Sequence, residues 1–256
     1  MYLPAEPTAN VLVGDSGFIG VAGAEVLANS RRAGRVLWTA ERTRHVNAAL
    51  RRWLNVVVAT TLLVVLMPLM VLIGLLIKMT SPGPILYTQA RVGVDRRWNR
   101  ADRTNHRRVV DHGGRLFRIY KFRTMQVEPL AGQRWAVKGD PRVTALGGFL
   151  RRSRLDELPQ LFNVLVGDMN IVGPRPEQPK IFAELRHQIP SYADRQRVLP
   201  GITGLAQVNQ AYDTCTEDVR RKVQYDLEYI RRESPLEDLR ILMYTLPAVV
   251  GKRGGW

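Results

Sequence analysis

Two adjacent carboxylates, Asp156 and Glu157, stand between an arginine-rich stretch that includes Arg151 and the proline at position 159. Arginine side chains and a free helix N-terminus together bind anions. A carboxylate in such a place can attack phosphorus, or hold Mg²⁺ together with substrate phosphates. We expect the positive surroundings to lower the pKa of the aspartate and to keep it ionised. The ordinary alternative is that the pair only begins a helix, because carboxylates stabilise the positive end of a helix.

Three further basic residues are candidates for phosphate binding. Arg175 lies in the segment GPRPE (173–177), where two prolines restrict the backbone around it. Lys121 and Arg123 are two residues apart in an apolar–basic alternation, so we expect them on one side of a strand. The alternatives are a rigid connector for 173–177 and a solvated strand face for the other two.

The elements that must position these residues follow from hydrophobic spacing and from proline and glycine. Residues 116–125 predict a strand, because apolar and basic residues alternate there. Residues 145–154 predict a short amphipathic helix, and Pro159 begins another that runs to about Val166. Further predicted elements are a polar helix over 178–188, a turn and short strand over 199–209, a helix over 217–232, and a core or membrane-interface helix over 235–250.

A long apolar segment precedes this region. Leu54 to Ile77 contains 24 residues without a charge, about 36 Å of helix, against about 30 Å of hydrocarbon in a bilayer. Both flanks are rich in arginine, so the positive-inside rule assigns no orientation. Pro68, near the middle, removes a backbone hydrogen bond and bends a helix. We therefore favour a re-entrant anchor, which leaves the membrane on the face where it entered, over a bitopic span or a buried core helix.

Composition narrows the classes of ligand. Lys and Arg total 38 against 23 acidic residues, a formal charge of +15, and all but six of the basic residues are Arg. This bias fits phosphate binding, in nucleic acid, lipid headgroups or phosphorylated substrates, and it also fits a GC-rich genome. The apolar segment argues against nucleic acid. A single cysteine, Cys215, excludes an internal disulfide and a multi-cysteine zinc site.

The first fifty residues form a weakly patterned leader. Within it, residues 10–20 (NVLVGDSGFIG) have the glycine spacing of a dinucleotide-binding turn. That function needs a complete βαβ unit and more strands, but the apolar segment follows about thirty residues later. A nucleotide-sugar epimerase or dehydrogenase would also need Tyr-x-x-x-Lys, which the sequence lacks. We interpret the stretch as a fragment resembling a nucleotide-binding fold.

Four segments together resemble one known family: KFRTM (121–125), DPRVTALGGFLRRSRLDELPQLFNVLVGDMNIVGPRPE (140–177), LPGITGLAQVN (199–209) and YDLEYIRRESPLEDLRILMYTL (225–246). They are similar to the bacterial sugar transferases, the monotopic polyprenyl-phosphate phosphoglycosyl transferases, over about residues 50–250. The resemblance implies a mostly helical α+β fold, with a re-entrant membrane helix at 51–79 and a small catalytic domain with interfacial helices at 80–250. It also implies a place on the cytoplasmic face of the bacterial inner membrane, among membrane lipids.

The same resemblance implies the reaction and its residues. Asp156 would be the nucleophile that takes a phosphosugar from a nucleotide sugar, such as a UDP-sugar, and passes it to polyprenyl phosphate, starting glycan assembly. Glu157 would be the general base or the partner of Asp156, and Asp156 would also hold Mg²⁺. The matching positions around phosphate and nucleotide are Arg151, Arg175, Lys121, Arg123 and Asp168. Pro68 would break the membrane helix, and a homodimer is left open.

Two departures from the family pattern stand out. Met67 replaces the serine that often precedes the proline of the membrane helix, and the basic stretch 95–114 is longer than usual. Neither touches the acidic pair. A binding or scaffold protein that uses the fold without catalysis is the alternative, and it predicts loss of the acidic pair or of the GPRPE segment.

Overall fold

A computed structural model describes residues 21–96, 111–126, 140–210 and 215–250, and the side chains from Val46 to Thr245 within these ranges. The chain divides into two units after Val46, and each is described by itself. Helix α1 (Val21–Thr80) supplies the described backbone of the first unit. The glycine-containing stretch 10–20 lies outside the described residues, as does most of the basic stretch 95–114.

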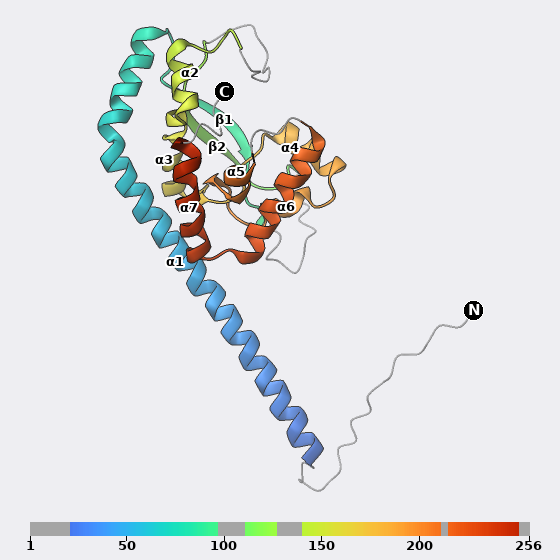
Figure 1. The fold of residues 1–256 in the computed structure, drawn as a ribbon. Coiled ribbons are helices and arrows are strands. Elements are labelled where there is room, and N and C mark those ends of the chain that lie inside the picture. The colour runs from blue at the N-terminus through green and yellow to red at the C-terminus, as the bar shows by residue number, and fades with distance from the viewer. Residues whose placement is uncertain (1–20, 97–110, 127–139, 211–214, 251–256) are drawn as a thin grey trace, which may run out of the picture. The chain divides into compact units, whose positions relative to one another are not determined.

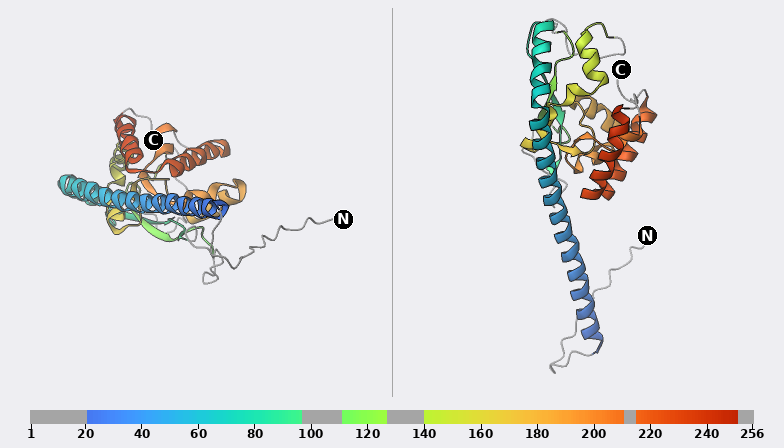
Figure 2. Two further views of the ribbon diagram at one scale, coloured as in Figure 1. Left: turned by 90° about the horizontal axis from the view of Figure 1, so that it is seen from below. Right: turned by 60° about the vertical axis from the view of Figure 1, so that its left-hand side comes forward.

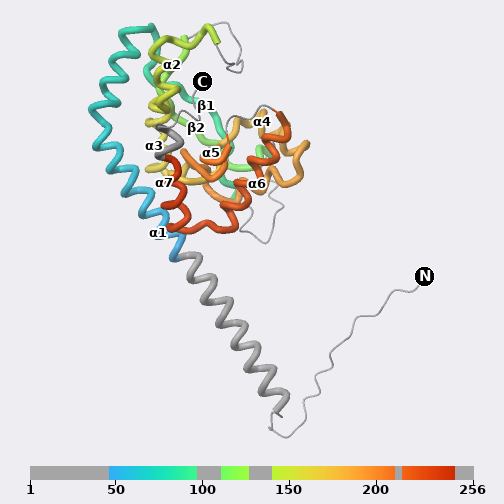
Figure 3. Tube along the Cα trace, in the orientation of Figure 1, coloured from blue at the N-terminus to red at the C-terminus, as the bar shows by residue number. Residues whose placement is uncertain are grey.

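The second unit is mostly helical with two small sheets, which confirms the predicted α+β class (Figures 1 and 3). The structure contains the predicted strand near 116 and the helices that begin near 145, 159, 178, 217 and 235. After α1 the elements are β1 (Leu86–Val92), β2 (Leu116–Phe122), α2 (Ala145–Arg152), η2 (Leu155–Glu157), α3 (Gln160–Val166), β3 (Asn170–Val172), α4 (Pro179–Gln188), η3 (Tyr192–Arg197), β4 (Gly201–Thr203), α5 (Leu205–Asn209), α6 (Thr216–Arg232) and α7 (Pro235–Val250).

The two sheets of the described region bring distant parts of the chain together. Strands β1 and β2 pair antiparallel, with Leu86 opposite Phe122. On β2, Phe117 and Ile119 alternate with exposed residues, so one face of the strand enters the core. Strands β3 and β4 pair in parallel, and β3 leads directly into the segment 173–177.

One face of the apolar part of α1 belongs to the core of this second unit. Its buried residues are spaced by three, four and seven positions, the pattern of one helix face: Ala59, Leu63, Met70, Ile73 and Ile77. They share a cluster with Phe117 of β2, Leu161 of α3 and Ile241 of α7. The opposite face exposes residues such as Val64, Val65 and Leu75.

The segment Val46–Thr80 is the one helix of the described chain that is long and apolar enough to cross a membrane, and an 18-residue stretch within it has a mean hydropathy of 2.8. Pro68 lies inside it, and α1 continues past the proline to Thr80. The helix curves along the second unit beside α2, α3 and α7 but does not fold back on itself (Figures 1 and 2). The expected helix break at Pro68 is therefore a curve within one continuous helix.

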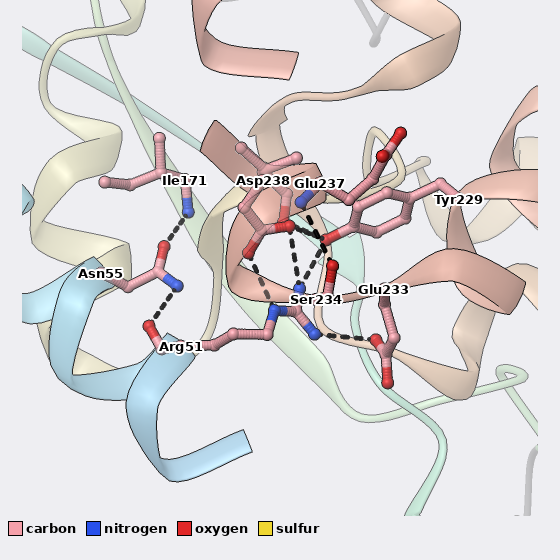
Figure 4. A network of polar contacts seen from close by, with 9 residues as sticks. Arg51, Asn55, Ile171, Tyr229, Glu233, Ser234, Glu237 and Asp238 are labelled. Atoms are coloured by element: carbon pink, nitrogen blue, oxygen red, sulfur yellow. Dashed lines mark hydrogen bonds and ion pairs between the residues drawn. The ribbon is translucent and has the colours of Figure 1, made fainter. Parts of the chain in front are cut away.

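Polar side chains tie the start of this segment to the C-terminal helices (Figure 4). Arg51 donates from Nε to Asp238 Oδ2 and from Nη1 to Glu233 Oε2, each over 2.8 Å, and from Nη2 to the Tyr229 hydroxyl. The Tyr229 hydroxyl lies 2.8 Å from Asp238 Oδ1 and 3.1 Å from the Val172 carbonyl oxygen. We call Arg51, Tyr229, Glu233 and Asp238 the anchor cluster.

Two further contacts join α1 to the same unit. Asn55 accepts a hydrogen bond at Oδ1 from the Ile171 backbone N–H over 2.6 Å, next to the anchor cluster (Figure 4). Past the other end of the helix, Arg123 donates to the carbonyl oxygens of Pro82 and Ser81 over 2.6 and 2.8 Å. Both ends of the apolar segment are thus fastened to one body.

Candidate active site

A sharp turn after α2 presents the acidic pair. Thr144 caps α2 by accepting from the Gly147 N–H, and the helix ends at Arg152. Arg154 then adopts a left-handed conformation with φ 56°, which is uncommon for a residue with a side chain and marks local strain. The turn leads into η2, which carries Asp156 and Glu157, before Pro159 begins α3. Both carboxylates are buried.

Glu157 is held by two cations. Its Oε1 atom lies 2.6 Å from Lys121 Nζ and 2.6 Å from Arg175 Nη2, and its Oε2 atom lies 3.5 Å from Arg175 Nη1. Although burial acts in the opposite direction, these two cations hold the pKa of Glu157 well below its usual range. Glu157 is therefore ionised throughout the neutral range and fixed in place.

Asp156 is in the opposite situation. Within the described residues, its carboxylate has no hydrogen-bond or ion-pair partner. Burial, and next the negative charge of Glu157, raise the pKa of Asp156 to about 6, against the weaker influence of Lys121, Arg175 and Arg151. The expectation that arginines would lower this pKa is wrong, because the cations pair with Glu157 instead. The result is a poorly solvated carboxylate that is nevertheless ionised at neutral pH.

Glu157, its two cationic partners and the neighbouring Asp156 define a small site, which we call the dyad cluster: Asp156, Glu157, Lys121 and Arg175. Lys121 comes from β2 and Arg175 from the segment after β3, so the site joins three separate parts of the chain. Burial lowers the pKa of Lys121, but Glu157 opposes this effect. The structure thus brings together four of the seven residues expected around phosphate and catalysis.

Arg151 lies beside the dyad cluster and contacts the end of β2. Its Nε donates to Thr124 Oγ1 over 2.9 Å, and its charge acts on Asp156. The start of α2 packs closely here, because a Cβ added at Gly147 would lie 2.0 Å from the Thr124 carbonyl oxygen. Only glycine allows this approach, which sets the distance between Arg151 and β2.

Two other expected residues are used elsewhere. Arg123 is buried and donates to the carbonyl oxygens of Ser81 and Pro82, so it secures the end of the apolar helix. Asp168 lies beyond the other end of α3 from the acidic pair, with its Oδ1 3.7 Å from Arg115 Nη2. Pro68 is within α1, and in the described part of the chain no hydrogen bond or ion pair joins any of these three residues to the dyad cluster.

The described residues allow only a sparse metal site. No group of three or more His, Cys, Asp or Glu side chains gathers anywhere in the described part of the chain. A carboxylate without a protein partner does fit Mg²⁺, which usually takes one or two carboxylates and completes its shell with water and substrate phosphates. Asp156 can serve in this way, together with a bound diphosphate.

Several ion pairs near the site cannot be predicted from the sequence around their residues. Arg195 and Asp226 form a fully buried pair with Nε and Oδ2 at 2.6 Å, and Lys222 Nζ lies 3.2 Å from Glu177 Oε1. In sequence these residues stand in polar stretches that predict a solvated surface. Their partners are about 30 to 45 positions away, so only the fold reveals the pairs.

Comparison with known proteins gives one family and several relatives. Residues 46–252 match the family described as bacterial sugar transferase. The chain is 38% identical over 206 residues to a UDP-N-acetylgalactosamine-undecaprenyl-phosphate N-acetylgalactosaminephosphotransferase of Aeromonas hydrophila, covering 80% of this chain and 44% of that protein. It is 39% identical over 206 residues to the UDP-glucose:undecaprenyl-phosphate glucose-1-phosphate transferase of Escherichia coli K12, covering 78% and 40%.

The lengths of the relatives differ. The chain spans less than half the length of those two proteins. A third relative, the exopolysaccharide production protein PSS of Rhizobium leguminosarum bv. phaseoli, is 32% identical over 221 residues, which cover 82% of this chain and all of that protein. The family match, over residues 46–252, includes the apolar helix and the dyad cluster.

Proposed function

Because the chain belongs to the bacterial sugar transferase family, we propose that it transfers a sugar 1-phosphate from a UDP-sugar to undecaprenyl phosphate. Two of the relatives named above are described by their names as carrying out this type of transfer, one with N-acetylgalactosamine and one with glucose. The observation that carries the proposal is the buried Asp156 carboxylate, which has no polar partner among the residues that the structure describes and lies beside a Glu157 paired with Lys121 and Arg175.

In the first step Asp156 acts as the nucleophile. A carboxylate oxygen attacks the β-phosphorus of the UDP-sugar, the bond from this phosphorus to the bridging oxygen breaks, and UMP leaves with the electron pair. The sugar 1-phosphate is then bound to Asp156 as an acyl phosphate. A poorly solvated carboxylate favours this attack, because less hydration must be removed before it reaches phosphorus.

In the second step a phosphate oxygen of undecaprenyl phosphate attacks the same phosphorus. The bond between Asp156 and phosphorus breaks, the carboxylate is regenerated, and undecaprenyl diphosphate sugar is released. The acceptor phosphate is already ionised near neutral pH, so this step needs no strong base. With a pKa well below its usual range, Glu157 is suited to hold Lys121 and Arg175 in place, as the partner of Asp156, rather than to accept a proton.

The cations of the site neutralise the substrates. Both substrates are polyanions, and an anionic nucleophile approaches phosphorus only where their charge is compensated. Lys121, Arg175 and Arg151 supply positive charge from the protein. Mg²⁺ held by Asp156 and the diphosphate would supply charge stabilisation for the leaving phosphate.

The membrane arrangement that we propose is monotopic, on the cytoplasmic face of the bacterial inner membrane. Both ends of the apolar segment are fastened to the same body, at Arg51 and at Ser81, and one helix face is part of that body's core. A helix that crossed the bilayer at right angles would carry this polar body into hydrocarbon, at a high cost. A shallow helix that returns to its own side keeps the dyad cluster at headgroup level, where the acceptor phosphate lies.

Release of UMP tests the activity. Membranes containing the protein are incubated with Mg²⁺, undecaprenyl phosphate and a panel of UDP-sugars, beginning with UDP-glucose and UDP-N-acetylgalactosamine. We expect acceptor-dependent UMP release with at least one sugar. Absence of release with every sugar would contradict the enzymatic proposal and would favour a binding or scaffold role on the same fold.

Cysteine labelling tests the topology. In a Cys215→Ser background, single cysteines at the exposed positions 46 and 84 are treated with an impermeant reagent in inverted and right-side-out vesicles. Labelling of both positions in the same vesicle orientation supports the monotopic arrangement. Labelling in opposite orientations would show a bitopic span.

A further inference from the structure

The segment that carries Arg175 has no regular secondary structure, yet its backbone is held by hydrogen bonds to other elements. The Pro174 carbonyl oxygen accepts from the Gly201 N–H over 3.0 Å, and the Glu177 carbonyl oxygen accepts from the Val92 N–H over 2.9 Å. The backbone is also tightly packed against β4, because a Cβ added at Gly201 would lie 2.1 Å from the Gly173 nitrogen. Both ends of the segment are therefore fixed by backbone contacts.

Two arginine side chains hold the carbonyl oxygens between these ends. Arg195 Nη2 donates to the Arg175 carbonyl oxygen over 2.9 Å, and Arg91 Nη1 donates to the Pro176 carbonyl oxygen over 3.1 Å. Four consecutive carbonyl oxygens thus accept from donors on β1, η3 and β4. Because each such bond fixes the plane of a peptide, the direction in which the Arg175 side chain leaves the backbone is fixed as well.

These two arginines are themselves held by carboxylates. Arg195 pairs with the buried Asp226, and Arg91 Nη1 lies 3.8 Å from Oε2 of the partly buried Glu177. Neither of them forms an ion pair or hydrogen bond with the acidic pair at 156 and 157 within the described residues. Burying a guanidinium is costly unless it is paired. Besides its carboxylate partner, each of these two arginines binds a backbone carbonyl oxygen of the segment that carries Arg175.

We propose that Arg91 and Arg195 are positioning residues, which act on the reaction through Arg175. They hold the backbone of residues 173–177 so that the Arg175 guanidinium meets Glu157 at 2.6 Å. A shift of about 1 Å would break that contact, and displacements of this size can lower rates about a hundredfold. The proposal rests on the proposed function for its effect on rate, and on the structure alone for the hold on the segment.

Hydrogen exchange tests the hold on the segment without any substrate. The Val92 and Gly201 amides report on it, because their acceptors are carbonyl oxygens of this segment. In Arg91→Met, and separately in Arg195→Met, we expect these two amides to exchange about three- to tenfold faster, as expected when a neighbouring hydrogen bond is lost. The Arg91 side chain is 16% exposed and that of Arg195 is fully buried, so Arg91→Met keeps the test available if Arg195→Met fails to fold.

Arg186→Met is the matched control. Arg186 also donates to a backbone carbonyl oxygen, that of Asp111 over 3.2 Å, but away from the segment 173–177. We expect the exchange of Val92 and Gly201 and the rate of UMP release to stay unchanged in this variant. Arg91→Lys, which keeps one donor for the Pro176 carbonyl oxygen, should recover part of the activity that Arg91→Met loses.

A double-mutant cycle separates positioning from general damage. We expect Arg91→Met to lower UMP release at least about tenfold in the unaltered chain, but less than about threefold when Arg175→Ala is already present, because residues that act through one another are not additive. Equal losses in both backgrounds would overturn the proposal, as would unchanged amide exchange. If the unaltered chain released no UMP, the proposed function would fail, and the exchange rates would decide the hold on the segment alone.

Discussion

In the anchor cluster one guanidinium meets two carboxylates and a phenol, whereas in the dyad cluster two cations converge on one carboxylate and leave its neighbour without a partner. Both clusters are largely buried, and both join segments that are far apart in sequence. In the anchor cluster, each of Glu233, Asp238 and Tyr229 has a polar contact with Arg51. In the dyad cluster, Asp156 has none within the described residues.

This difference indicates that the anchor cluster attaches one element to another, whereas the dyad cluster is suited to a reaction. Pairing every charge in a buried cluster offsets the cost of desolvation, and the result is a fixed contact between two elements. Leaving one carboxylate unpaired costs stability, and such a cost is found where a group must react. The following predictions test this division, from the largest effect to the smallest.

Removal of the unpaired carboxylate should have the largest effect. We expect Asp156→Asn to lower UMP release at least about a thousandfold and to abolish the covalent phosphosugar, because the amide is no nucleophile. UMP release and mass spectrometry of the trapped protein measure this. The same change in the anchor cluster, Asp238→Asn, should lower the melting temperature while the folded protein keeps more than about a tenth of its activity. Comparable losses of activity in both variants would contradict the proposal that only the dyad cluster takes part in the reaction.

Removal of one cation from the dyad cluster should have the next largest effect. Lys121→Met leaves Glu157 with Arg175 alone, so the negative charge of Glu157 is less compensated when polyanionic substrates bind. We expect kcat/KM to fall about a hundredfold, as for the loss of one electrostatic contact in other active sites. The exposed Lys180→Met serves as the control for loss of a positive charge. A similar decrease in both variants would point to net charge instead of the site.

Removal of the single cation of the anchor cluster should act on stability. Arg51→Met leaves two carboxylates without their partner, and we expect the free energy of unfolding to fall by about 2–3 kcal/mol, below the about 3–5 kcal/mol of fully buried pairs, because Glu233 is 39% exposed. Thermal unfolding in detergent measures this. Adding Asp238→Asn should restore part of the stability. If Arg51→Met lowered the rate per folded molecule and left stability intact, the anchor cluster would belong to the reaction.

The pH dependence should show the smallest effect, and it follows from the unpaired carboxylate. Since the pKa of Asp156 is raised to about 6, we expect kcat/KM to fall as pH decreases through about 6, where Asp156 becomes protonated. Stability has the opposite sign for this group: its pKa lies above the unfolded value of 3.8, so its contribution decreases as pH rises from 3.8 to about 6. A rate that stays constant from pH 5 to 8 would contradict the raised pKa.

Much of the fold could be predicted, because it depends on local patterns. The amphipathic pattern over 145–154, the proline at 159 and the alternation that begins at 116 each predict an element that the structure contains. The alternation of apolar and basic residues does not predict correctly where the strand ends. Strand β2 stops at Phe122, so Arg123 no longer shares a face with Lys121 and bonds instead to the end of the apolar helix.

The candidate site could be predicted only in part. Lys121, Arg175 and the acidic pair were found because each stands in a short pattern with a chemical meaning. The sequence does not predict that Glu157 is paired while Asp156 is left without a partner in the described residues, because this depends on which carboxylate the two cations contact. The sequence does not distinguish Arg51 from the other arginines that flank the apolar segment, because its partners lie nearly two hundred residues later.

The packing of α1 has a practical consequence for the production of the protein. Deleting residues 47–80 would remove Ala59 and four larger core side chains, each of the four worth about 1.5–3 kcal/mol when fully buried, and would expose the faces of α3 and α7 that they cover. A water-soluble form therefore cannot be obtained by trimming the anchor. The helix that we propose as the membrane anchor thus also completes the hydrophobic core.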